Sequence, residues 1–169
     1  MPNPIHYAKV PAHPSAKPAI DTPANVTDLA TVIMSEAGIY NSPAQTAVGF
    51  TVVNRMIRDK ATAVSRVWSG YAHNQAPTPM IRTLAKNILS GKVVDPTKGA
   101  THFFSPQLMP RKGQPTTGID VAGGLEKVTG LPYETYQPGW ATRFVHVTVP
   151  GVLPSQFQFY REPGHGPVR

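Results

Sequence analysis

The first half of the chain carries nearly all of its helical periodicity, and this limits the fold more than any other feature. Leu29, Val32 and Ile33 recur at three- and four-residue steps, the spacing that places side chains on one side of a helix. Thr27 precedes them and is the expected N-cap. Gly38 follows them and suits the left-handed position after a helix end. The spacing therefore predicts a first helix with one apolar side.

Two further helices are predicted on the same grounds. Ser42 is the expected N-cap of the second, with Pro43 at the first helical position and Gln45 placed for a capping box. The third, Pro79–Ser90, has the clearest periodicity. A shorter helical piece is expected over residues 61–68. The first half of the chain is thus predicted to be mainly helical.

The second half has a different composition. Residues 101–104 and 144–149 are predicted to be extended, and the latter alternate clearly enough to pair with 156–160 as a hairpin. Residues 105–140 are rich in Pro, Gly and Thr and are expected to form a long loop, with one helical turn around 125–128. These patterns predict an α+β, mainly α, single domain with a small β-hairpin region and a long loop.

Residues 1–24 contain six prolines, a density that excludes a helix and predicts an extended arm before a domain at 25–169. The first residues lack a basic segment followed by an apolar run, so no secretory signal peptide is expected. No window approaches the roughly 18 apolar residues of a membrane span, so none is expected either.

The net charge of the chain favours an acidic partner. Lys and Arg number 16 against nine Asp and Glu, giving +7 and a pI near 9.9. Nucleic acid, an anionic membrane and an acidic polymer such as a bacterial cell wall all fit this charge. The basic residues are dispersed, with no run longer than Arg111-Lys112, which argues against nucleic acid.

The lack of cysteine and the spacing of the histidines exclude several kinds of site. Cysteine is missing, which excludes disulfides, thiolate metal sites and a Cys nucleophile. The six histidines include no close pair at metal-ligand spacing, so neither a metal site nor another cofactor is expected.

Glu36 is the first candidate for catalysis. One more step of the apolar spacing in the first helix reaches Glu36, which places a carboxyl group on the side that packs inward. Burial raises the pKa of a carboxyl group, and the negative end of a helix dipole disfavours its ionisation further. A carboxylic acid that keeps its proton near neutral pH can act as a general acid. The alternative is an exposed Glu or one paired with Lys or Arg.

Three motifs carry a resemblance to a known family. These are Glu36-Ala37 at the end of the first helix, Val53-Asn54-Arg55 at the end of the second, and the run Asp95–Phe103. Their order and spacing resemble the SleB-like cell-wall hydrolases, over about residues 29–160. The resemblance implies a lysozyme-like fold, cleavage of the β-1,4-linked glycan of peptidoglycan, and Glu36 as the general acid.

The resemblance also implies a setting. A small, basic domain without a secretion signal is similar to the peptidoglycan glycoside hydrolase effectors of type VI secretion. These effectors act in the periplasm of a target bacterium, and a cognate immunity protein blocks the cleft. A phage endolysin also lacks a signal, so the export route stays open.

Further residues are assigned to the site. Many glycosidases use a second carboxylate, and Asp120, Glu126 and Glu134 in the long loop are the candidates. In the alternative the substrate supplies its own nucleophile, the 2-acetamido oxygen for hydrolysis or the 6-hydroxyl of N-acetylmuramic acid in a lytic transglycosylase. Asp95 is expected to hydrogen-bond within its turn, and Asp59 and Glu162 to lie outside the site.

Substrate contacts are expected from side chains near the matching run. The candidates are His102 and Thr101, which can bind an acetamido or hydroxyl group, and Tyr71, Tyr133 and Trp140, which can stack on sugar rings. Asn54 is expected to be a buried hydrogen bonder and Arg55 to pair with a carboxylate. The rival function is a non-catalytic binding module for peptidoglycan or nucleic acid, in which Glu36 closes a salt bridge.

Overall fold

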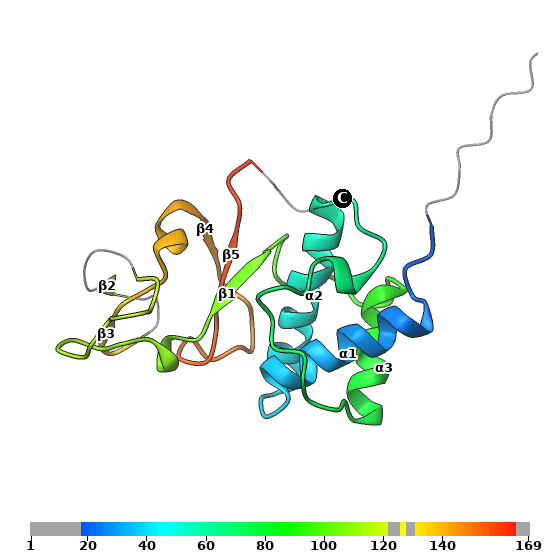
Figure 1. Cartoon of the computed structure of the whole chain (residues 1–169), viewed down its shortest axis with the longest axis horizontal. Coiled ribbons are helices and arrows are strands. Elements are labelled where there is room, and N and C mark those ends of the chain that lie inside the picture. Colours follow the sequence, from blue (N-terminus) through cyan, green and yellow to red (C-terminus); the bar gives the residue numbers. More distant parts are fainter. Residues whose placement is uncertain (1–17, 122–125, 128–130, 165–169) are drawn as a thin grey trace, which may run out of the picture.

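The protein has an α+β fold that is mainly helical. The computed structural model describes residues 18–121, 126–127 and 131–164. In these residues three α-helices form one side of the molecule, a small antiparallel sheet lies beside them, and irregular segments with two short strands lie beyond the sheet (Figure 1). No described helix combines the length and the hydropathy that crossing a membrane requires.

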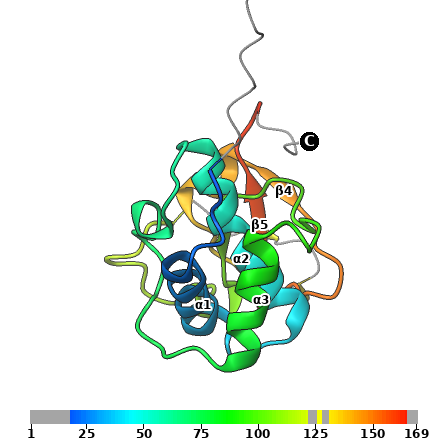
Figure 2. The same ribbon diagram turned by 90° about the vertical axis from the view of Figure 1, so that its right-hand side faces the viewer.

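The helices are α1 (Pro23–Ala37), α2 (Ser42–Arg58) and α3 (Pro79–Leu89), with a 3-10 turn η1 (Val64–Arg66) between α2 and α3. Figure 2 shows the molecule from the helical side, with α1 and α3 in front of α2. Their apolar sides form the main core. Its fully buried members include Leu29, Val32, Ile33, Val52 and Val64. The periodicity of the sequence therefore predicted the helical layer correctly.

The helix starts differ from the predicted ones. The N-caps are Thr22, Asn41 and Thr78, whose side-chain oxygens accept hydrogen bonds from backbone N–H groups of the first turn at 3.1–3.3 Å. Thr27 and Ser42 lie inside helices, so the predictions for both caps were wrong. The reason is that proline, which lacks the N–H group that a first turn leaves unpaired, occupies that turn in all three helices.

The predicted capping box at the start of α2 and the predicted glycine stop after α1 were also wrong. Gln45 donates to the carbonyl of Tyr40 at 3.0 Å, so it does not complete a capping box. Gly38 has φ −59°, in the right-handed region, so it is not a left-handed stop. Its lack of a side chain matters for another reason, because a Cβ there would collide with the carbonyl oxygen of Met34.

The first helix begins within the predicted arm. Residues 1–17 of the predicted arm lie outside the described residues. Pro23 and Ala24, which the prediction placed in the arm, begin α1. The proline at position 23 is compatible with a helix because it stands at its first residue.

The sheet consists of β1 (His102–Phe104), β4 (Val145–Val147) and β5 (Gln158–Arg161), in the order β1-β5-β4 and antiparallel throughout. The predicted hairpin of the last two strands is confirmed, and β1 adds to the other edge of β5. Phe103, Val147 and Phe159 share one register row, and Phe103 and Phe159 pack against the helical layer. The neighbouring row, which contains His102 and Tyr160, faces the opposite side.

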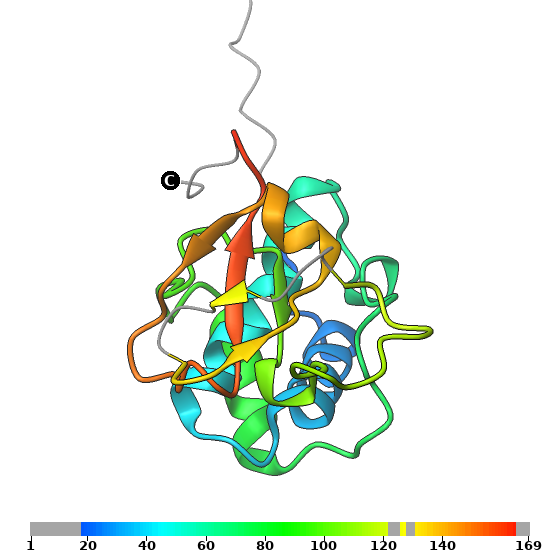
Figure 3. The same ribbon diagram turned by 90° about the vertical axis from the view of Figure 1, so that its left-hand side faces the viewer.

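A third group of segments covers that opposite side of the sheet. It contains the 3-10 turns η2 (Pro106–Leu108) and η3 (Gly139–Arg143) and the two-residue strands β2 (Glu126–Lys127) and β3 (Glu134–Thr135). Figure 3 shows β2 and β3 in yellow and η3 in orange, in front of the red β5. The predicted helical turn at 125–128 is wrong in its described part, which is β2; Leu125 and Val128 lie outside the described residues.

Asn54 joins the helical layer to the chain that leads into β1. Its Nδ2 donates to Asp95 Oδ2 at 3.0 Å and to the carbonyl of Ala100 at 2.9 Å. Asp95 in turn accepts from the backbone N–H of Thr97 at 2.7 Å and closes the turn. The predicted buried hydrogen bonds of Asn54 and the predicted turn at Asp95 are both confirmed.

Replacing Asn54 by Ala is expected to lower the free energy of unfolding by about 1–3 kcal/mol, because it leaves buried acceptors unpaired. Urea unfolding followed by circular dichroism measures the change. Asn74→Ala, at an exposed position in the loop after η1, is the matched control. Equal unfolding midpoints for the two variants would contradict the bridging role of Asn54.

Candidate functional site

Glu36 lies in the last turn of α1, one residue before the fully buried Ala37. Its side chain is half-buried. The backbone N–H of Ala72 donates to Oε1 at 2.6 Å, which fixes the orientation of the carboxyl group. Oε2 accepts no hydrogen bond from any described residue, so it is the oxygen available to a ligand.

The loop after η1 is held against the end of α1 at two adjacent positions. Ser35 Oγ accepts from the backbone N–H of Gln75 at 2.9 Å, next to the bond between Glu36 and Ala72. Within the loop, the His73 ring stacks on Trp68 with centroids 4.2 Å apart. These contacts keep the Ala72 N–H group in place beside the carboxyl group.

Burial raises the pKa of Glu36 above its ordinary value of 4.5. Two weaker effects oppose it, because the Ala72 N–H group and the positive charge of Arg55 both favour the ionised carboxylate. The sequence predicted the direction of the shift from burial. It did not reveal the two opposing interactions, which come from a backbone group and from another helix.

Arg55 lies near the end of α2 and contacts two of the other candidates, Thr101 and Tyr71. Its Nε donates to the carbonyl of Thr101 at 2.7 Å, and its guanidinium carbon lies 4.4 Å from the centre of the Tyr71 ring. Its charge also affects Glu36 and His102. The predicted pairing of Arg55 with a carboxylate is wrong, because no ion pair involves it among the described residues.

Tyr71 is a core residue. It is 5% exposed, its hydroxyl donates to Thr51 Oγ1 at 3.1 Å, and its ring lies 5.9 Å from that of Phe103. One face of the ring is covered by Arg55. Tyr71 therefore offers no exposed face to a sugar, and its contribution is to support the guanidinium group.

Thr101 and His102 lie together at the start of β1. The hydroxyl of Thr101 is 2.9 Å from His102 Nδ1 and 3.5 Å from Glu162 Oε1, and Glu162 also pairs with Arg58. The sequence had placed Glu162 in a tail outside the site. Its contacts show that it belongs to the end of the sheet beside α2.

The aromatic candidates separate into two places. The half-buried Trp140 in η3 packs on His102, with ring centroids 5.0 Å apart. Tyr133 instead precedes β3, where the guanidinium of Arg111 lies 4.2 Å from the centre of its ring. The structure therefore brings Trp140 and His102 together, and Tyr133 is engaged elsewhere.

Of the three candidates for a second carboxylate, the two whose side chains are described form no hydrogen bond with Glu36. Asp120 is exposed and lies beside Gly139, and Glu134 is exposed on β3. The side chain of Glu126 lies outside the described residues. In the described part of the chain, moreover, no three His, Asp or Glu side chains gather as a metal site would require.

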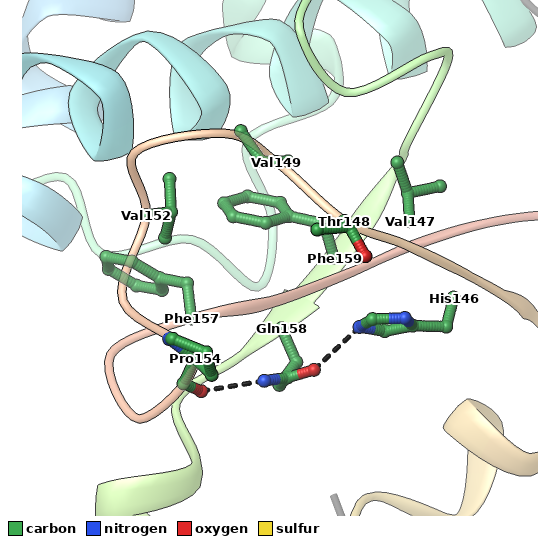
Figure 4. A pocket seen from close by; sticks show the side chains of 9 residues that line it. All are labelled: His146, Val147, Thr148, Val149, Val152, Pro154, Phe157, Gln158 and Phe159. Carbon is green, nitrogen blue, oxygen red and sulfur yellow. Dashed lines mark hydrogen bonds between the residues drawn. The ribbon is translucent and has the colours of Figure 1, made fainter. Parts of the chain in front are cut away.

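Glu36 does not line any of four hollows on the described part of the surface. A small one of about 50 Å³ lies between β5 and the segment after β4, where Gln158 links His146 to the carbonyl of Pro154 (Figure 4). Larger ones lie beside Ile20, Arg161 and Met80. Glu36 lines none of these four, so its contacts rather than a cavity identify it as the candidate.

No protein-family model, curated protein or solved structure matches this chain. The resemblance to SleB-like hydrolases therefore stays a prediction carried by the three motifs.

Burial, reinforced by the charges of Arg55 and Arg58, lowers the pKa of His102 from 6.5 to about 4. Because the folded protein resists protonation of this ring, His102 is expected to lower the stability progressively as the pH falls from 6.5 to 4. The NMR signal of its Cε1 proton, assigned by its loss in His102→Gln, should titrate near pH 4. A midpoint near 6.5 would show that the ring is hydrated as in a free peptide.

Proposed function

We propose that this protein is a peptidoglycan glycosidase with a lysozyme-like arrangement, in which Glu36 is the general acid. The observation that carries the proposal is the state of the Glu36 carboxyl group. One oxygen is fixed by the Ala72 N–H group, the other has no partner among the described residues, and burial raises its pKa. A positioned carboxyl group that keeps its proton is what cleavage of a glycosidic bond requires.

In the proposed reaction, Oε2 of Glu36 donates its proton to the glycosidic oxygen while the adjoining sugar ring acquires oxocarbenium character. The leaving sugar departs with that proton, and Glu36 becomes a carboxylate. Ala72 and Arg55 both favour the charged form, so their interactions strengthen as the proton leaves. Stabilisation that grows toward the transition state is the kind that accelerates a reaction.

The small number of acidic residues, nine in the whole chain, favours a nucleophile supplied by the substrate. Peptidoglycan offers two, the 2-acetamido oxygen, which leads to hydrolysis, and the 6-hydroxyl of N-acetylmuramic acid, which leads to an anhydro sugar. A single acid is sufficient for either route. The net charge of +7 supports approach to a wall polymer rich in carboxylates.

The proposal includes the setting that the resemblance implies. The protein would be an antibacterial effector that acts in the periplasm of a target bacterium and is neutralised by a cognate immunity protein. His102, Thr101 and Trp140 are proposed to contact the glycan, because they lie together at the start of β1 and in η3.

Glu36→Gln is expected to reduce cleavage of purified sacculi by about 100-fold or more, because an amide cannot supply the proton. Mass spectrometry of the soluble products measures the release of new reducing or anhydro ends. Glu134→Gln, which makes the same chemical change at an exposed position on β3, should keep the wild-type rate.

Wild-type cleavage by Glu36→Gln would refute the assignment of the acid. Binding of sacculi by the wild-type protein without any new ends would favour the rival function, a non-catalytic wall-binding module. The terminal sugar of the products identifies which of the two glycosidic bonds is cut.

A further inference from the structure

Arg55 is a cation held rigidly beside the proposed general acid. The Tyr71 ring supports one face of its guanidinium group at 4.4 Å, and the Thr101 carbonyl accepts from Nε at 2.7 Å. The side chain is half-buried. The two contacts engage one face and one N–H group, and the terminal nitrogens Nη1 and Nη2 donate to no described residue.

Among the described residues Arg55 forms no ion pair, in contrast to the next turn of α2. Arg58, three residues later, forms ion pairs with both Asp59 and Glu162. Arg55 has none with any carboxylate of the described residues. A half-buried guanidinium whose terminal N–H groups have no protein partner loses hydration without a compensating hydrogen bond, and these groups match the two oxygens of a carboxylate.

We infer that Arg55 is a receptor for a carboxylate of the substrate, bound through the two terminal guanidinium nitrogens next to Glu36. This inference rests on the proposed function and specifies which glycan the site accepts. Peptidoglycan carries such a group in two places, on the lactyl ether of a peptide-free N-acetylmuramic acid and on the stem peptide. A neutral N-acetylglucosamine polymer carries none.

A bound carboxylate would also act on the general acid. The charge of Arg55 lowers the pKa of Glu36, so an anion that neutralises this charge raises it. Glu36 would therefore hold its proton more firmly when an acidic glycan occupies the site. Substrate binding and protonation of the acid are coupled in this arrangement.

The test measures binding in the Glu36→Gln background, where neither cleavage nor titration of Glu36 contributes. Three polymers are compared: intact sacculi, sacculi stripped of stem peptides by an amidase, and sacculi whose carboxylates have been converted to amides. Adding Arg55→Gln is expected to weaken binding to at least one carboxylated polymer by about tenfold or more, as for the loss of a charge-assisted contact. Binding to the amidated polymer should change less than twofold.

Two further substitutions separate a specific contact from net charge and from folding. Arg66→Gln removes the same charge at an exposed position in η1, and should change the affinity for all three polymers less than threefold. Arg55→Lys keeps the charge but loses the planar fork, and should bind with intermediate affinity. Thermal unfolding of each variant establishes that the comparison is made on folded protein.

The two carboxylated polymers identify the source of the carboxylate. A loss confined to the peptide-free polymer assigns the lactyl group, and a loss confined to intact sacculi assigns the stem peptide. An equal loss on the amidated polymer, or no loss on any polymer, would overturn the inference. Either result would leave the proposed function intact if the wild-type protein still releases new glycan ends.

Discussion

The junction between the end of α2 and the start of β1 determines how the two main layers of this protein meet. Asn54 donates to Asp95 and to the carbonyl of Ala100, and the adjacent Arg55 donates to the carbonyl of Thr101. These bonds cross from a helix to the segment that leads into β1, more than 40 residues later in the sequence. They place Thr101 and His102 beside a helical layer whose first helix, α1, carries Glu36.

The pKa of Glu36 is set by opposing effects, of which burial is the largest. Burial raises its pKa, while one backbone N–H group and one cation lower it. The same two groups would stabilise the carboxylate that remains after proton transfer. In the proposed reaction Glu36 supplies the first proton. Its position depends on the Ala72 loop staying against α1, which Ser35 and Gln75 secure through a second hydrogen bond.

Local patterns in the sequence predicted the elements of the fold well, and distant contacts much less well. The apolar steps at Leu29, Val32 and Ile33 correspond to fully buried residues of α1. The alternation after residue 144 predicted the β4–β5 hairpin. The predicted N-caps of the first two helices were wrong by five positions and by one. A Thr or Asn that lies further from the apolar residues can cap a helix as well as a Thr or Ser that lies nearer to them. The addition of β1 to β5 was not predicted, since no local signal specifies a partner so far along the chain.

In the candidate site, too, the local sequence predicted some residues, and contacts between distant segments were missed. Glu36 could be found because a carboxylate interrupts an apolar helix side, and burial then determines the direction of its pKa. Glu162 was missed because Arg58, its partner, lies 104 residues away. The Ala72 contact was missed because a backbone donor leaves no trace in residue type. Tyr71 was assigned to sugar stacking on the basis of its aromatic ring alone, and its burial under Arg55 removes the face that stacking requires.

The most direct test is an NMR titration of the Glu36 carboxyl carbon in protein labelled with ¹³C-glutamate, with Glu36→Gln to assign the signal. The account predicts a midpoint above 4.5, reported at the same pH by the amide proton of Ala72, which donates to this carboxyl group. A midpoint at or below 4.5, or an Ala72 amide signal that does not follow the titration, would contradict it.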